Sequence, residues 1–356
     1  MSDQPGTEVT VPNPPDESSV LTLITDLAET VATGIPAPIR KTFFKAVHQL
    51  CMAGVDVGVA KLEGIAAETR AGTKNRVKIL DTTGSQIAKR LDVTQEYVDA
   101  ALDNASAQIV KKRINLDKTV LIAIKDVQEK PTLQIGSEPT IERKEISDDW
   151  LNAFQQEAEN MSSEHMQMLF GKILAGEIRK PTSFSIRTVK LMAQLDNRPA
   201  QLFRKLCSIA CTLRFGSLVT DSRVIAVKGN ASSNGLQDFG LSFGDLNVLF
   251  EYGLIINDYN SYMMYLGSIA REHGVAMPFT YLNKPYALVP KAPMTMEQMM
   301  AFKVNGVALS RAGMELLDIV EVEEDANFTA ALTAFFDGQG YTIGNVTVPS
   351  TAPTAP

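Results

Sequence analysis

Between Ile146 and Phe215 the chain repeats apolar residues at helical spacing, and this run of amphipathic segments constrains its fold most strongly. The first helix is predicted to begin after Ser147, a good N-cap residue. Asp148 and Asp149 follow it and suit the positive end of the helix dipole. Its buried stripe is predicted to be Trp150, Leu151, Phe154 and Ala158. Because such a stripe must be covered, the pattern predicts a packed helical block.

Three further helices complete this block in the prediction. Ser162 or Ser163 caps the second, whose apolar residues recur at positions i, i+3, i+4, i+7 and i+8: Met166, Leu169, Phe170, Ile173 and Leu174. Gly176 and Pro181 bracket its end, and a third helix runs from Ser183 to Leu195. The fourth follows Pro199, with one face formed by Leu202, Phe203, Leu206, Ala210 and Leu213.

The segments before the block are predicted to be helical as well. Helical patterns cover residues 36–71, 83–91 and 94–128, and the Pro and Gly residues after them indicate a linker. Both ends of the chain are rich in Pro, Ser and Thr with little to bury, which is typical of disorder. The predicted organisation is a disordered tail (1–18), an N-terminal helical region (19–130), a linker (131–145), the central block (146–215), a C-terminal domain (216–345) and a second tail (346–356).

After Gly216 helices alternate with short strand patterns. Strands are expected at 224–227, 253–256, 281–289 and 304–309, and helices at 242–252, 310–320 and 328–336. Helix, strand, long wing, strand and helix is the order of a winged-helix-like α+β domain. The predicted fold class is therefore mainly α, with N-terminal and central helical bundles followed by a small winged-helix-like domain.

Charge is unevenly distributed along the chain. Residues 40–125 hold 15 Lys and Arg against 9 Asp and Glu, a net of +6, whereas residues 216–356 hold 7 against 14, a net of −7. This asymmetry suits domain docking or contact between copies, and a basic surface for nucleic acid or anionic lipid is the alternative. Three cysteines and an N-terminus without a signal-peptide pattern favour a reducing, cytoplasmic location.

The central block also carries a family resemblance. Its residues are Asp149-Trp150-Leu151, then 161–167 and 170–178, then 181–188, with a Leu-Ser-x-x-Gly-x-x-Leu pattern within 306–317. Over these residues the chain resembles the bacterial family called domain of unknown function 2806, and more weakly the abortive-infection alpha proteins of antiviral defence. The resemblance implies a bacterial protein and points to phage defence, but it carries over no catalytic residue.

Six residues of this motif are proposed as a functional or structural site: Trp150, Gly176, Glu177, Pro181, Ser185 and Arg187. Glu177 and Arg187 flank the turn at Pro181. A contact that fixes this turn is the simpler interpretation, and a binding site is the alternative.

Motifs with catalytic spacing have structural interpretations that are favoured. The segment 240–244 matches G-x-S-x-G, but loop residues precede it, and Ser242 with Asp245 is a capping pair for the next helix. Cys207 and Cys211 are separated by one helical turn, yet no Cys or His pair completes a zinc site, which favours buried thiols. A phosphate-binding glycine motif is absent from the sequence. The sequence therefore predicts no enzyme activity, cofactor or metal.

Two further segments bear on partners. Residues 85–103 have helix-turn-helix spacing, but the second helix presents Gln95, Glu96, Asp99 and Asp103. The three carboxylates among these side chains repel phosphates. Residues 53–58 have small-x-x-x-small spacing, but charges interrupt the apolar stretch, so helix packing is favoured over peripheral membrane contact and a transmembrane span is not expected.

These features together predict a non-enzymatic bacterial protein that acts by protein contact or oligomerisation, with a role in phage defence implied by the resemblance. The alternative is a DNA-binding regulator that uses residues 85–103 or the C-terminal winged domain. A hydrolase built on Ser242 is the third hypothesis.

Overall fold

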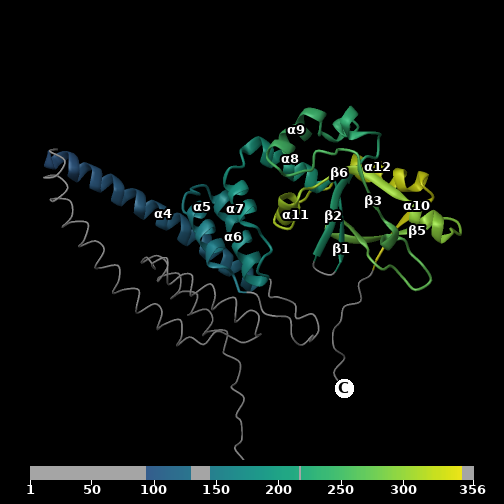
Figure 1. The fold of residues 1–356 in the computed structure, drawn as a ribbon, viewed down its shortest axis with the longest axis horizontal. Coiled ribbons are helices and arrows are strands. Elements are labelled where there is room, and N and C mark those ends of the chain that lie inside the picture. Colours follow the sequence, from purple (N-terminus) through teal and green to yellow (C-terminus); the bar gives the residue numbers. More distant parts are fainter. Residues whose placement is uncertain (1–93, 130–144, 216–217, 347–356) are drawn as a thin grey trace, which may run out of the picture. The chain divides into compact units, whose positions relative to one another are not determined.

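The fold is described from a computed structural model, which defines residues 94–129, 145–215 and 218–346 (Figure 1). The chain divides into two compact units, Met1–Val189 and Lys190–Pro356, and the division falls within helix α7 (Ile186–Ala193). Each unit is described by itself.

The described part of the first unit is helical. It contains α4 (Gln95–Glu129), α5 (Asp148–Ala158), α6 (Glu164–Arg179) and the start of α7. Figure 1 shows the long helix α4 running alongside α6, and a glycine makes this close packing possible. A Cβ atom at Gly171 of α6 would lie 2.5 Å from Ile122 Cγ2 of α4, so a larger residue would force the two helices apart.

Local sequence signals account well for these helices. Ser147 Oγ accepts a hydrogen bond from Trp150 N (3.1 Å), and Ser163 Oγ accepts one from Met166 N (3.3 Å), so both predicted caps are confirmed. The predicted stripe of α5 is buried. On the predicted face of α6, Phe170, Ile173 and Leu174 are buried, whereas Met166 and Leu169 are partly exposed. The helix predicted at 94–128 is confirmed as α4.

The second unit is an α+β domain. Its strands are β1 (Ala210–Phe215), β2 (Leu218–Ile225), β3 (Ser261–Met264), β4 (Phe279–Tyr281), β5 (Lys284–Pro290), β6 (Lys303–Ala308) and β7 (Tyr341–Asn345). Its remaining helices are α8 (Asn197–Ser208), α9 (Phe243–Glu251), α10 (Met296–Ala301), α11 (Arg311–Leu317) and α12 (Ala326–Gly338). The strands form one sheet in the order β3-β6-β2-β1-β4-β5-β7, and every neighbouring pair is antiparallel.

This sheet corrects the predicted fold class. A seven-stranded antiparallel sheet is the centre of a sizeable α+β domain, and the prediction of a mainly α protein with a small winged-helix-like domain was wrong. The error begins at the fourth helix of the central block, because α8 ends at Ser208 and residues 210–215 form β1. Residues 210–213 are buried between β2 and β4, and a short run that is buried on both faces lacks the alternation that marks a strand.

The other strand predictions agree only partly with the observed strands. The strand predicted at 281–289 is the hairpin β4–β5, whose turn residues Leu282 and Asn283 both have positive φ (48° and 60°), the conformation of a tight hairpin turn. The strand predicted at 253–256 contributes only an isolated bridge, between Ile255 and Leu309. Strands β3 and β7 were not predicted.

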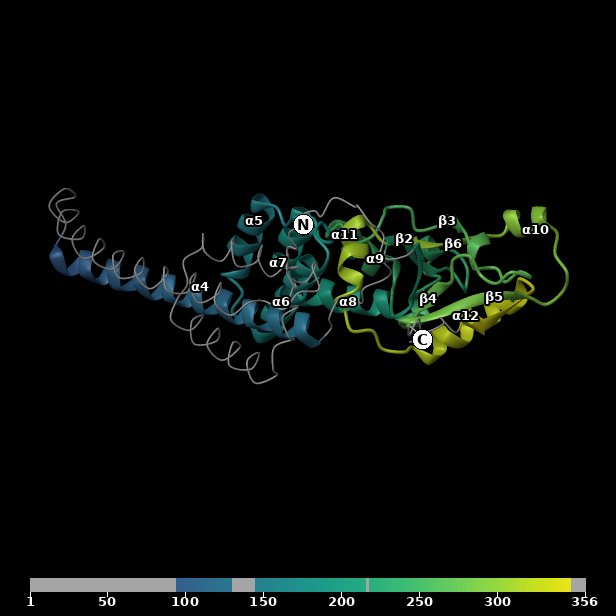
Figure 2. The same ribbon diagram turned by 90° about the horizontal axis from the view of Figure 1, so that it is seen from below.

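Aromatic residues form the core beside β4 and α12. The Phe279 ring centre on β4 lies 5.7 Å from that of Phe336 on α12, 5.8 Å from Tyr286 on β5 and 6.0 Å from Tyr265. Helix α12 packs against β7 (Figure 2), and the Phe302 and Tyr341 rings lie 4.7 Å apart next to Phe336. Phe279 is fully buried, so this cluster joins the middle of the sheet to its helical cover.

We predict that Phe279→Ala lowers the free energy of unfolding by about 3–5 kcal/mol, because it removes a buried ring and leaves a cavity among three others. Urea unfolding followed by circular dichroism measures the change. Val289→Ala on β5, where the side chain is exposed, is the matched control, and a loss no larger than that of the control would contradict this role of Phe279.

Candidate functional site

The turn between α6 and α7 brings together most of the motif residues proposed from the sequence. Glu177 is buried, and its carboxylate accepts backbone N–H groups from Thr182 (2.6 Å) and Phe184 (3.0 Å). Trp150 Nε1 on α5 donates to the carbonyl oxygen of Phe184 (2.7 Å). One carboxylate and one indole therefore hold both sides of the turn backbone.

The other motif residues shape the same turn. A Cβ atom at Gly176 would lie 2.6 Å from the Phe184 ring, so the glycine makes room for that ring. Pro181 is buried, and Ser185 Oγ accepts from Thr188 N (3.2 Å) in the first turn of α7. Arg187 is exposed on α7 and takes part in no hydrogen bond or ion pair that we find among the described residues. The arrangement places five of the six residues together, and their contacts fix backbone geometry.

We predict that Glu177→Ala lowers the free energy of unfolding by about 3 kcal/mol or more, because two buried N–H groups lose a charged acceptor. Glu177→Gln keeps one carbonyl acceptor and should lose roughly half as much. Thermal and urea unfolding measure both variants. Equal stability of Glu177→Ala and the parent protein would contradict a structural role and favour the binding-site alternative.

Ser242 caps α9. Its Oγ accepts from Asp245 N (3.2 Å), while Asp245 Oδ2 accepts from Ser242 N (3.0 Å) and Ser242 Oγ (2.7 Å), so the predicted capping pair is confirmed. A short 3-10 helix (Gln237–Phe239) precedes the segment, where a nucleophile elbow would need a strand. We find no hydrogen bond from Ser242 to Asp258 or His273 in the described part of the chain. The serine hydroxyl is used in the cap.

The capping carboxylate gives this helix a pH dependence. The hydrogen bond from Ser242 Oγ holds the pKa of Asp245 below the ordinary value of an aspartate, against the smaller opposing effect of burial. A lowered pKa contributes stability above the unfolded-state value, and this contribution is lost as the pH falls through the folded-state pKa.

We predict that Asp245→Asn lowers the free energy of unfolding by about 1 kcal/mol near neutral pH. The difference from the parent protein should shrink as the pH falls below the ordinary pKa of an aspartate and through the lowered pKa of Asp245, because both proteins then lack the charged carboxylate. Urea unfolding at a series of pH values measures it. A difference that stays constant, or grows, in acid would argue against the capping role of the charge.

The two described cysteines are buried in different elements. Cys207 lies in α8 and Cys211 in β1, so they do not share the helical face assumed from their spacing. Burial raises the pKa of both thiols, which keeps them protonated, and the prediction of buried thiols is confirmed. Within the ranges that the structure describes, no group of three or more His, Cys, Asp and Glu side chains is arranged to bind a metal.

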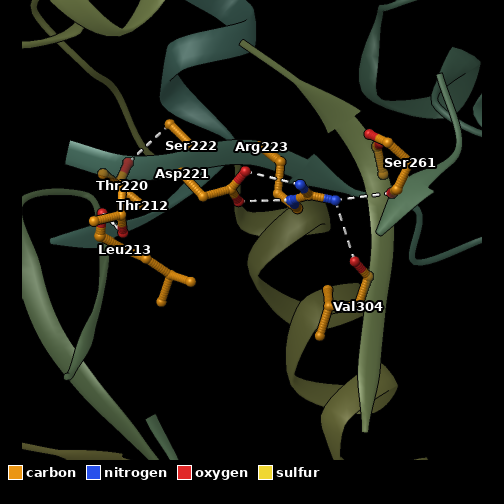
Figure 3. A network of polar contacts seen from close by, with 9 residues as sticks. Thr212, Leu213, Thr220, Asp221, Ser222, Arg223, Ser261 and Val304 are labelled. Carbon is orange, nitrogen blue, oxygen red and sulfur yellow. Dashed lines mark hydrogen bonds and ion pairs between the residues drawn. The ribbon is translucent and has the colours of Figure 1, made fainter. Parts of the chain in front are cut away.

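A buried ion pair ties three strands of the sheet together (Figure 3). Arg223 on β2 donates from Nε and Nη2 to the two carboxylate oxygens of Asp221 (2.6 and 2.7 Å). Its Nη1 donates to the carbonyl oxygens of Ser261 on β3 (2.8 Å) and Val304 on β6 (3.3 Å). Both charged side chains are buried, so this pairing compensates for the loss of their hydration. Neighbouring polar contacts join Thr212 to Ser222 (2.9 Å) and Thr220 to Leu213 (3.1 Å).

Tyr265 follows β3 and is fully buried near this ion pair. Its hydroxyl has no hydrogen-bond partner among the described residues. Burial raises the pKa of Tyr265 well above its usual value, and the nearby Cys211 and Asp221 add to the shift, while Arg223 opposes it. Neither Tyr265 nor Arg223 is predicted from the sequence, because nothing in their local sequence distinguishes them from surface residues.

A cavity of about 470 Å³ lies between α8 and the residues before α12. Its walls include Gln201, Arg204, Lys205, Ser208, Glu323 and Glu324. Arg204 forms an ion pair with Glu323, and Ser208 Oγ accepts from Glu323 N (3.1 Å). Side chains that line this cavity therefore bind one another, and none of the lining residues is a serine or cysteine paired with a base.

Strand β3 forms one edge of the sheet, and its apolar residues are exposed. It pairs with β6 on one side, and no strand of the described chain pairs with the other. Tyr262 and Met264 are 54% and 50% exposed, and Lys303 Nζ lies 4.1 Å from the centre of the Tyr262 ring. The carbonyls of Ser261 and Val304 that Arg223 binds face the space between β3 and β6. Since backbone groups alternate along an antiparallel strand, those of Tyr262 and Met264 face the open edge.

Predictions about nucleic acid and membranes fall partly outside the described residues. Residues 53–58 and 85–93 lie outside them, and residues 95–103 form the first turns of α4. Glu96, Asp99 and Asp103 are exposed there, as predicted, and a face with these carboxylates is unfavourable for phosphate contact. None of the described helices combines the length and apolarity that crossing a bilayer requires. DNA binding through residues 85–103 stays a prediction.

The fold defines an α+β domain in the second unit, and the buried side chains of Glu177 and Arg223 bind backbone groups. The family model described as "Protein of unknown function (DUF2806)" matches residues 104–333, so the chain belongs to this family, as the resemblance in the central block predicted. Neither the curated proteins nor the solved structures contain a match.

Proposed function

We propose that this protein acts by protein contact, without an enzymatic activity of its own, and that the open edge of β3 is the contact surface. The observation that carries the proposal is the exposure of Tyr262 and Met264 on a strand whose outer edge lacks a partner in the described chain. Both the backbone groups and the apolar side chains of these two residues are then available to another strand.

Edge strands are normally protected against such pairing. Charged residues, proline or a bulge usually interrupt an exposed edge, because unpaired N–H and C=O groups form a template for another chain. Strand β3 contains neither a charged residue nor a proline, and its register with β6 is regular. Ile256, which is 49% exposed, lies just before β3 along the same side of β6 and extends the apolar character of the edge.

Strand addition at this edge would contribute both main-chain hydrogen bonds and side-chain pairs. Each main-chain hydrogen bond to a partner strand contributes about 0.5–1.5 kcal/mol net, and each favourable cross-strand side-chain pair adds roughly 0.2–1 kcal/mol. Three polar residues of a kind that can act in catalysis are already used in structural contacts, which supports the same proposal. Ser242 caps α9, Glu177 binds the backbone of the turn after α6, and Arg223 binds a carbonyl group of β3.

We predict that a photo-crosslinking aromatic residue at Tyr262 forms a discrete covalent protein adduct in living cells. The same residue at Val289, an exposed position on the interior strand β5, is the matched control and should form none. Denaturing electrophoresis with an antibody to the chain detects the adduct.

Adding Met264→Pro should abolish this adduct. Proline removes an outward N–H group, and edge strands tolerate proline at such positions. Circular dichroism checks that the variant is folded. Equal adducts at both crosslinker positions, or none at Tyr262, would overturn the proposal.

The weaker likeness of the central block to abortive-infection alpha proteins extends the proposal to antiviral defence. We predict that cells expressing the chain resist at least some members of a broad phage panel, that Met264→Pro removes the protection and that Ser242→Ala retains it. Plaque counts measure all three. Unchanged plaque counts across the whole panel would count against the defence role, and loss of protection in a folded Ser242→Ala protein would favour the hydrolase hypothesis.

A further inference from the structure

We propose that the strand that pairs with β3 is β3 of a second copy of this chain, arranged about a two-fold axis through Met263. This inference rests on the proposed contact role of the β3 edge and names its partner. The resulting contact joins two sheets side by side into one continuous antiparallel sheet.

The backbone of β3 suits this register. An antiparallel copy centred on Met263 places Tyr262 opposite Met264 of the second copy, and Met264 opposite Tyr262. These are the residues whose N–H and C=O groups face the open edge, so each pair exchanges both of its main-chain hydrogen bonds. Met263 then faces its own counterpart as a non-hydrogen-bonded pair, in which the Cα atoms lie about 4.5 Å apart.

The side chains are also self-complementary. Tyr262 and Met264 lie on the same face of β3 and are both exposed, so the two-fold axis brings each tyrosine ring beside a methionine side chain. A methionine sulfur near the edge of an aromatic ring is a favourable contact, and the arrangement forms it twice. A register shifted by one residue would instead place the exposed residues opposite the partly buried ones, Ser261 and Met263.

Charge does not oppose this pairing at the contact itself. Strand β3 is uncharged, and the exposed Lys303 lies one strand further in, with its amine over the Tyr262 ring of its own chain. Residues 216–356 carry 7 Lys and Arg against 14 Asp and Glu, so two copies repel one another at long range. Because salt screens such repulsion, self-pairing should strengthen as salt rises, whereas a complex with a basic partner would weaken.

Cysteine crosslinking of the full-length chain tests this register. In a Cys51→Ser background, Met263→Cys should form a disulfide-linked dimer under mild oxidation, with at least about tenfold the yield of Val289→Cys, because the paired Cα atoms fall within the range of about 4.4–6.8 Å that a disulfide needs. The remaining cysteines, Cys207 and Cys211, are buried and leave the background low. Non-reducing electrophoresis measures the yield.

Two single variants control for the register. Tyr262→Cys alone and Met264→Cys alone should each give little dimer, whereas a mixture of the two should give a crosslinked heterodimer, since these positions face each other across the axis. Light scattering after size exclusion provides a second measurement without cysteine chemistry. The parent chain should have twice the mass of one chain, more so at high salt, and folded Met264→Pro and Met264→Lys should have the mass of one.

The outcomes separate this inference from the proposed function. If Met263→Cys gives no more dimer than Val289→Cys while a crosslinker at Tyr262 attaches a different protein, self-pairing is overturned and the contact role of the edge survives. If the crosslinker at Tyr262 gives no adduct, both are overturned. A dimer whose yield is equal for all cysteine positions would also reject this register.

Discussion

The buried ion pair of Asp221 and Arg223 is the interaction on which the arrangement of the open sheet edge depends. The Arg223 side chain is buried, and a buried guanidinium is stable only if a nearby negative charge compensates its own charge and acceptors bind its N–H groups. Arg223 meets this condition with one carboxylate on its own strand and with carbonyls of Ser261 and Val304 on two other strands. The position of β3, a strand of only four residues, is therefore defined from inside the sheet.

A comparable arrangement fixes the helical unit. Glu177 is buried and binds two backbone N–H groups of the turn after α6, and Trp150 binds a carbonyl of the same turn. In both units, a charged side chain that would suggest chemistry if it lay in an open cleft is used instead to satisfy backbone groups. The exposed edge strand is therefore a better candidate for a contact surface than these buried polar residues.

Sequence reasoning succeeded where the information is local and failed where it is not. The caps at Ser147, Ser163 and Ser242 are confirmed, because a cap depends on residues within one turn. The prediction that the helix continues past Ser208 was wrong, since residues 210–213 are buried on both faces and only their neighbours β2 and β4 make them a strand. At the candidate site, the sequence singled out Glu177 and Trp150 but missed Arg223, Tyr262 and Tyr265.

By itself, the sequence determined the described helices of the first unit, the caps of α5 and α6 and the family to which the chain belongs. These features depend on the spacing of neighbouring residues, which a linear pattern records directly. Only the tertiary structure decided the strand order, the partners of Arg223 and the open edge at β3. The physical reason is separation along the chain: the carbonyls that Arg223 binds lie 38 and 81 residues away, and a strand is an edge only because of which strands pair elsewhere.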